Sequence, residues 1–462
     1  MQTTAHRAEA RATLSLIVSL AWPTVIEQAM STAVQYVDTA MVGVLGTQAT
    51  AAVGATGTVG WLLFCTISAV SVGFLAFVAK ACGANDRQSA QRASAQSVLM
   101  TLLLGSVLTL VVAVCSWHIP AWMQVDESIR QLSALYFFII WIPVLPRAAS
   151  AIFGTVLRAA GDTKTPMKVG VLVNLINVIL NFFLIYQTRP VSLGPLTVTI
   201  WGAGWGVVGA AIASAISVIA GGVLITVALW RHPMVSPRGA SFRPDGAILR
   251  PCLRIALPNA LQQFSTCMGF VAFAAMINSL GEVSTAAHTI ANTVESAFYI
   301  PGHGMSTAAS TLAGNAYGAG DARQMKSLAR MFIPLELVLM LLSGGALFAF
   351  APALVGLFTK SAEVVALGSV VLRMVAVSEP FYGFSIIMEG LMMGVGKTRA
   401  PFLYNLAGMW LLRVAGTALC IRVLRLGLVS AWACMIAHNM LVFVLYLIDY
   451  FRGTWNPLHR HG

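Results

Sequence analysis

Long apolar runs dominate the chain, and they are separated by short polar stretches. Twelve of these runs are long enough to cross a bilayer, which takes about 20 mostly apolar residues. They cover 13–39, 50–79, 93–116, 131–157, 167–187, 202–230, 252–279, 286–316, 331–356, 364–393, 401–423 and 427–451. None alternates strictly between apolar and polar residues, as the strands of a membrane barrel do. Since only helices and closed barrels satisfy their backbone within lipid, the pattern predicts an all-α integral membrane protein with twelve transmembrane helices.

The composition agrees with a membrane protein. Of the 462 residues 58% are hydrophobic and only 10% are charged, against roughly 25% charged residues in a typical soluble domain. This balance excludes a soluble enzyme, a nucleic-acid-binding protein and a secreted disulfide scaffold. The seven cysteines occur singly, so they suggest neither a metal site nor a disulfide framework.

The basic residues are distributed unevenly between the loops. With a cytoplasmic N-terminus, 20 of the 28 Lys and Arg residues lie on the cytoplasmic side. The other side has Arg130, Arg189, Lys360, Arg422 and Arg425. Such a bias sets membrane orientation. It predicts a multi-pass protein of the bacterial inner membrane, in contact with membrane lipids, with both termini cytoplasmic.

The chain repeats itself at a constant offset of 235 in the numbering. Pro23, Gly46, Gly83, Asp86 and Gly161 match Pro258, Gly281, Gly318, Asp321 and Gly396. Six spans per repeat give both halves the same orientation, as in transporters built from two parallel lobes. We therefore expect two pseudo-symmetric six-helix lobes, 1–230 and 251–462, around a central cavity. The polar segment 231–250 is the expected cytoplasmic linker, and the second lobe ends in a cytoplasmic tail. A duplicated scaffold without transport is the alternative.

Polar residues form a stripe along the first predicted span. They are Glu27, Gln28, Ser31, Gln35 and Asp38, at near-helical spacing. An ionisable residue inside a membrane is a functional candidate by default. Asp38 is the leading candidate for ion coupling, and Gln28 and Gln35 are candidate cavity residues. The alternative is a carboxylate that is permanently satisfied by neighbouring amides. Pro23 offers a hinge in the same helix.

A second one-faced stripe consists of amides in the span 167–187: Asn174, Asn177 and Asn181. Asn177 and Asn181 are candidates for binding Asp38 and registering its protonation, and Asn174 is a candidate cavity residue. The competing interpretation is that these amides only join neighbouring helices.

The second lobe has stripes of its own. They contain His288, Asn292, Glu295 and Tyr299 on one span and Glu379, Tyr382, Ser385 and Glu389 on another. Together with Gln263, the repeat partner of Gln28, they are candidates for binding a cationic substrate or a second ion. A network paired internally with Arg373 or Arg413 is equally compatible with the pattern. Glu336 lies near the end of its span, and we expect it to reach the membrane surface.

Four segments carry a family resemblance. They are PTVIEQAMSTAVQYVDTAMVGVLG at 23–46, GANDRQSAQR at 83–92, LRAAGDTKTPM at 157–167 and GVVGAAIAS at 206–214. Together they resemble the multidrug and toxic compound extrusion (MATE) family, and among its branches the DinF-like one. The resemblance implies two six-helix bundles that exchange drugs for protons or Na⁺. It places Asp38 on the family's coupling carboxylate, and Asn177 and Asn181 on the polar network of the fifth helix.

The chain departs from the family pattern at two places. Members with a Na⁺ site in the second lobe carry a carboxylate in the seventh helix, where this chain has Gln262, Gln263 and Thr266. Some relatives carry an acid where Asn181 stands. Both departures favour proton coupling through Asp38.

The sequence therefore predicts a secondary antiporter that exports amphipathic, often cationic, compounds in exchange for protons by alternating access. No HExxH, GxSxG or ATP-binding GxxxxGK[ST] motif is present, so we expect no enzyme, no cofactor and an ion gradient as the energy source. We expect a monomer that acts in drug resistance. The alternatives are Na⁺ coupling and a flippase for lipid-linked precursors. A flippase would favour many cavity cations, whereas only Arg147, Arg373 and Arg413 lie inside spans.

Overall fold

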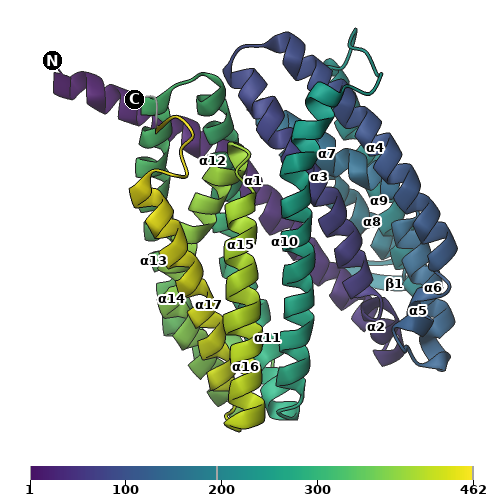
Figure 1. Ribbon diagram of the computed structural model, residues 1–462. Coiled ribbons are helices and arrows are strands. Elements are labelled where there is room, and N and C mark those ends of the chain that lie inside the picture. Colours follow the sequence, from purple (N-terminus) through teal and green to yellow (C-terminus); the bar gives the residue numbers. More distant parts are fainter. Residues whose placement is uncertain (1, 194–195, 460–462) are drawn as a thin grey trace. The chain divides into compact units, whose positions relative to one another are not determined.

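The computed structural model describes residues 2–193 and 196–459 (Figure 1). The last residues of the predicted tail, 460–462, lie outside this part of the chain. The helices of the first repeat are α1 (Gln2–Gly43), α2 (Thr47–Gly54), α3 (Gly57–Gly83), α4 (Arg87–Cys115), α5 (Ile119–Trp122), α6 (Glu127–Trp141), α7 (Val144–Ala159), α8 (Lys164–Leu184) and α9 (Gly206–Arg231). Those of the second are α10 (Gly246–Asn278), α11 (Glu282–Phe298), α12 (Ile300–Gly318), α13 (Ala322–Gly356), α14 (Ala362–Gly394), α15 (Arg399–Ala407), the π-helical η1 (Gly408–Ala415), α16 (Gly416–Ala418), the π-helical η2 (Leu419–Val423) and α17 (Leu428–Arg452).

The predicted all-α membrane fold is confirmed, and each of the twelve predicted spans coincides with helical structure. Ten helical segments within the described residues are long and apolar enough to cross a membrane, and the pair α6 and α7, bent by 45°, makes an eleventh. The remaining predicted span, 286–316, consists of α11 and α12. Its backbone breaks at Tyr299, and its polar residues reduce its hydropathy.

A short β-hairpin was not predicted. Strands β1 (Gln187–Leu193) and β2 (Leu196–Ala203) pair antiparallel between α8 and α9, with Pro190 opposite Thr199. The strands contain several β-branched residues, which favour this conformation. The hairpin replaces the start of the span expected from residue 202, and helix α9 begins at Gly206.

The contacts divide the chain into two compact units. The first unit contains Met1–Val25, Leu75–Asp86 and Arg250–Gly462, and the second contains Ile26–Phe74 and Arg87–Leu249. The division falls within α1, so this single helix contributes its first part to one unit and the rest to the other. The predicted lobe boundaries at 230 and 251 remain a prediction.

The repeat is visible in the backbone. Helices α1 and α10 end at the repeat partners Gly43 and Asn278, and α3 and α12 end at the repeat partners Gly83 and Gly318. Gly46 and Gly281, which follow α1 and α10, have φ values of 109° and 100°. This conformation is accessible to glycine at little cost. The two halves therefore share their turns as well as their helices.

Within the first unit, α3 and α12 cross closely. A Cβ atom on Gly83 would lie 1.9 Å from the Asn315 carbonyl oxygen, and one on Gly318 would lie 1.9 Å from the Lys80 carbonyl oxygen. Gly83 and Gly318 are repeat partners, as are Lys80 and Asn315. The same contact is therefore made twice, once from each repeat.

Candidate functional site

Asp38 lies in a polar cluster of the second unit. The Asn181 side chain, from α8, donates to Asp38 Oδ1 at 2.6 Å and to Asn177 Oδ1 at 3.1 Å. Asn177 in turn donates to Ser214 Oγ of α9 at 3.0 Å. Among the described residues no basic side chain lies within 4.0 Å of the Asp38 carboxylate. The cluster thus joins α1, α8 and α9 around one carboxylate that faces side-chain amides.

The Asn177 amide also faces Asp38, in the orientation that satisfies both its nitrogen and its oxygen. With the amide flipped, its nitrogen lies 2.8 Å from Asp38 Oδ1, and its oxygen accepts from Ser214 Oγ at 3.0 Å. Because a serine hydroxyl both donates and accepts, Ser214 satisfies either orientation. Asn177 therefore keeps its contact with α9 while its nitrogen faces Asp38.

The other first-lobe candidates lie outside this cluster. Gln28 and Gln35 are exposed, Asn174 is half-buried and Pro23 is buried within α1. On a membrane-spanning helix, an exposed side chain faces either lipid or water. Since glutamine is costly to expose to lipid, the positions of Gln28 and Gln35 are compatible with the predicted cavity.

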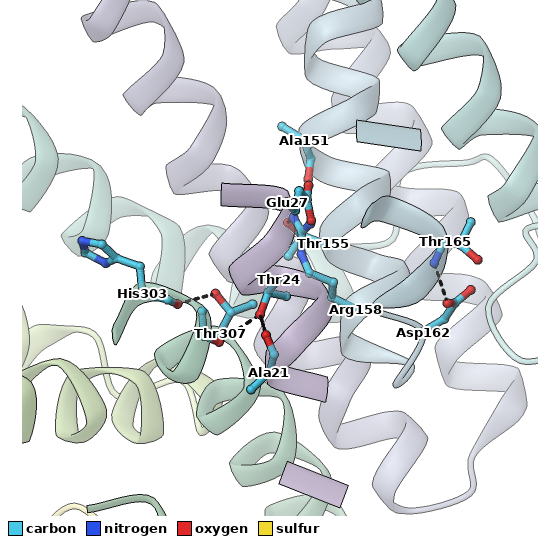
Figure 2. Close-up of polar contacts among 11 residues, drawn as sticks. Ala21, Thr24, Glu27, Ala151, Thr155, Arg158, Asp162, Thr165, His303 and Thr307 are labelled. Carbon is cyan, nitrogen blue, oxygen red and sulfur yellow. Dashed lines mark hydrogen bonds and ion pairs between the residues drawn. The ribbon is translucent and has the colours of Figure 1, made fainter. Parts of the chain in front are cut away.

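An ion pair close to Pro23 was missed by the sequence analysis. The Arg158 guanidinium, on α7, lies 3.2 Å from the Glu27 carboxylate and donates to Thr155 Oγ1 at 3.2 Å (Figure 2). The sequence analysis counted Arg158 among the basic residues of the cytoplasmic loops. That explained its charge, so no ion-pair partner was sought. The available signal was Glu27 itself, which belongs to the same polar stripe as Asp38.

One turn before Glu27, α1 is bonded within the first unit. Thr24 is buried, and its hydroxyl contacts the carbonyl oxygens of Ala21 at 2.7 Å and Gly304 at 3.1 Å (Figure 2). Gly304 belongs to α12. A Cβ atom there would lie 2.4 Å from Val25 Cγ2, so α1 and α12 approach each other closely at this point.

The second-lobe candidates form a buried network in the first unit. Tyr299 donates its hydroxyl to Glu295, and its ring packs on that of Tyr382 with centroids 4.7 Å apart. Gln262 donates to Glu389 at 2.7 Å. His288 packs between Phe273 and Trp432, Gln263 is half-buried and Asn292 is exposed. The structure therefore brings Glu295, Tyr299 and Tyr382 together and leaves Asn292 and Gln263 outside this group.

The expected position of Glu336 is wrong. Its side chain is fully buried on α13 and does not reach the surface. Gly302 and Gly383, on α12 and α14, make room for it, since a Cβ on Gly302 would lie 2.7 Å from Glu336 Oε1. Glu379, on α14, is also fully buried. Helix packing, which the linear pattern does not show, decided the position of both acids.

The two arginines suggested as partners of these acids make their direct contacts with other groups. Arg373 donates to the carbonyl oxygen of Phe348 at 3.4 Å. The guanidinium of Arg413, on η1, lies 4.6 Å from the ring centroids of both Phe270 and Phe273. Within the described residues neither arginine forms an ion pair with Glu295 or Glu379. The alternative in which these acids form direct ion pairs with Arg373 or Arg413 is therefore not what the described residues show.

Together, the fold and the cluster define a polytopic membrane protein with a carboxylate inside a duplicated helical bundle. A family model described as MatE matches residues 23–183 and again 258–419. The chain therefore belongs to the MATE family, whose members are transporters and not enzymes. The two matches begin at Pro23 and Pro258, which are partners in the internal repeat.

Individual relatives agree with this assignment. "Probable multidrug resistance protein NorM" of Thermotoga maritima is 26% identical over 439 residues, which cover 95% of this chain and 92% of that protein. "Multidrug resistance protein MdtK" of Yersinia pseudotuberculosis is 26% identical over 404 residues, 86% of this chain and 85% of that protein. A solved structure described as the outward-facing conformation of a multidrug resistance MATE family transporter has a TM-score of 0.87. It is 23% identical and the match covers 96% of both chains, which supports the fold. None of these comparisons specifies the DinF-like branch, so that assignment remains a prediction.

Proposed function

We propose that this protein is a proton-coupled multidrug antiporter of the bacterial inner membrane, with Asp38 as the proton carrier. The observation that carries the proposal is the contact between Asp38 and Asn181. A carboxylate inside a membrane helix, held by an amide and by no basic group, can bind and release a proton without breaking an ion pair. The names of the relatives, which are multidrug resistance proteins, support small molecules as substrates, and we propose that these are amphipathic and often cationic.

The amide cluster supplies the coupling step. An ionised Asp38 only accepts hydrogen bonds, whereas a protonated one also donates. With its nitrogen toward Asp38, Asn177 suits the ionised form; with its oxygen turned inward, it suits the protonated form. Protonation from outside thus exchanges the bonds between α1 and α8. We propose that α1 then bends near Pro23, where the missing N–H weakens the helix, and that the substrate is released outward.

Efflux of a fluorescent lipophilic cation from reconstituted vesicles tests the proposal. Wild type and Asp38→Asn are compared under an imposed pH gradient and, separately, under an imposed Na⁺ gradient. Asp126→Asn is the matched control, because Asp126 caps α6 outside the spans by accepting from the backbone of Ser128. We expect transport driven by the pH gradient in wild type and in the control, and none in Asp38→Asn.

Two other outcomes favour the alternatives. Transport that requires Na⁺ would make this a Na⁺-coupled antiporter, for which the oxygens of Asp38, Asn177 and Ser214 offer ligands. If wild type moves no cation under either gradient, the antiporter proposal fails and the lipid-linked precursor flippase takes its place.

A further inference from the structure

Helices α1 and α8 run side by side in matched register. Glu27 of α1 packs on Gly170 of α8, and eleven residues further along both helices Asp38 meets Asn181. Eleven residues are about three helical turns, or roughly 16 Å, so both contacts lie on one face of each helix. The seam between the two helices therefore carries a carboxylate of α1 at either end.

The Glu27 end of the seam is closely fitted. Both oxygens of Glu27 lie within 3.3 Å of Arg158 Nη1, and Arg158 Nη2 is held by Thr155. A Cβ atom on Gly170 would lie 3.3 Å from Glu27 Cγ, a distance that requires the side chain to move. Gly154 lies beneath the guanidinium, where a Cβ would be 3.7 Å away. α7 and α8 thus form a seat for this pair.

The ion pair of Glu27 and Arg158 is largely shielded from water. The Arg158 and Glu27 side chains are only 18% and 27% exposed, and both belong to predicted spans or their ends. Removing two charges from water is costly, and their attraction does not always compensate for that cost. A well-packed apolar pair would hold the helices at least as well, so the charges indicate a role other than adhesion.

The preceding turn of α1 is held by different partners. Thr24 bonds to the Gly304 carbonyl oxygen of α12, whereas Glu27 bonds to Arg158 of α7. Pro23 lacks the N–H that would bond back along the helix. Only Val25 and Ile26 separate the two attachments, and the chain changes from the first compact unit to the second between them. The two attachments of α1 therefore belong to different compact units, three residues apart along the helix.

We propose that Glu27 and Arg158 are positioning residues for transport. Their ion pair fixes the inner end of the α1–α8 seam, so that the exchange of bonds at Asp38 bends α1 between Thr24 and Glu27 instead of sliding the whole helix. Neither residue binds the proton or the substrate. This inference rests on the proposed function, because it assigns these residues to the step that follows protonation of Asp38.

Transport kinetics test the proposal with four variants in reconstituted vesicles: Glu27→Gln, Arg158→Gln, Arg158→Lys and the exchange Glu27→Arg with Arg158→Glu. Glu127→Gln is the control, since it removes the exposed pair with Arg130 at 3.5 Å in the same unit. The maximal rate and KM for a fluorescent lipophilic cation are measured under a pH gradient, and equilibrium binding of the same cation is measured in detergent.

We expect Glu27→Gln and Arg158→Gln to lower the maximal rate on the order of tenfold to a hundredfold, as misplacement of a supporting group does. Binding and KM should stay at the wild-type level. Arg158→Lys should retain part of the rate, since lysine keeps the charge but loses the fork that holds both Glu27 and Thr155. The exchanged pair should recover most of it, and Glu127→Gln should match wild type.

Three results would overturn the inference. Unchanged rates in the single variants, with an active wild type, reject the positioning role and leave the proposed function intact. A parallel loss of binding and rate shows that the pair only maintains the fold. A wild type that is not driven by the pH gradient rejects the proposed function, and this inference with it.

Discussion

The two repeats share helix ends and turns, but their ionisable side chains lie at different positions. At the offset of the repeat, Asp38 corresponds to Phe273 and Glu27 to Gln262. Phe273 packs against Arg413, whereas Asp38 meets an amide. The duplicated turns and helix ends are set by backbone requirements that any pair of lobes must meet. The ionisable side chains are free of that requirement, so each lobe has placed them on different helices.

The second lobe also hides its acids more thoroughly. Glu295 is 4% exposed and Glu379 is fully buried, whereas Asp38 is half-buried beside an exposed stretch of α1. A buried carboxylate can hold helices together or respond to a rearrangement, but it does not meet a proton from the external solution directly. The difference supports the proposal that Asp38, in the first lobe, is the residue that exchanges protons.

The largest expected effect is a loss of stability at the crossing of α3 and α12, where both repeats make the same contact. Gly83→Ala and Gly318→Ala each place a methyl group against a backbone carbonyl at the α3–α12 crossing. Overpacking of this kind costs about 1–3 kcal/mol, or more when the backbone must move. Because the contact is symmetric, both variants should lower Tm, measured by tryptophan fluorescence in detergent, by similar amounts.

Gly57→Ala is the control for the crossing, since Gly57 lies on the same helix α3 and a Cβ atom there would have nothing within 4 Å. Alanine is favoured over glycine in helices by up to about 1 kcal/mol. Its Tm should therefore equal or exceed that of wild type. Markedly unequal effects of the two crossing variants would show that the repeats do not contribute equally to this contact.

The sequence predicted the helical fold more completely than it predicted the candidate site. Hydropathy located the twelve spans, and helical spacing put Asp38 and Asn181 on facing stripes that do meet. The twelve spans were predicted without breaks, although Pro143 marks the bend after Trp141 and Pro301 marks the break at Tyr299. The ion pair of Arg158 was missed because this residue was counted among the basic residues of the cytoplasmic loops. Glu336 was misplaced because the glycines that accommodate it belong to two other helices.

An intermediate effect is expected for Glu295→Gln, which separates the second lobe from the coupling step. Glutamine still accepts the hydrogen bond from Tyr299 and removes only the ionisable proton. We expect the rate under a pH gradient to change by less than about tenfold, equivalent to about 1.4 kcal/mol, with KM for a cationic substrate unchanged. A raised KM would show that the acid binds substrate, and complete loss of transport would place coupling in both lobes.

The smallest effect is expected outside the membrane, at the end of the linker. Asp245 pairs with Arg92 and accepts from the backbone N–H of Ala247, where α10 begins, and these contacts hold the pKa of its carboxyl below the usual value. Because the folded state favours the ionised form, the stabilisation is present above pH of about 4, the pKa of an unpaired Asp. It is lost as pH falls through the lower pKa of the folded protein. Asp245→Asn should therefore lower Tm slightly at neutral pH, and the difference from wild type should shrink as the pH falls below about 4. A difference that is constant across this range would show that the hydrogen bonds of the side chain, and not its charge, hold the linker.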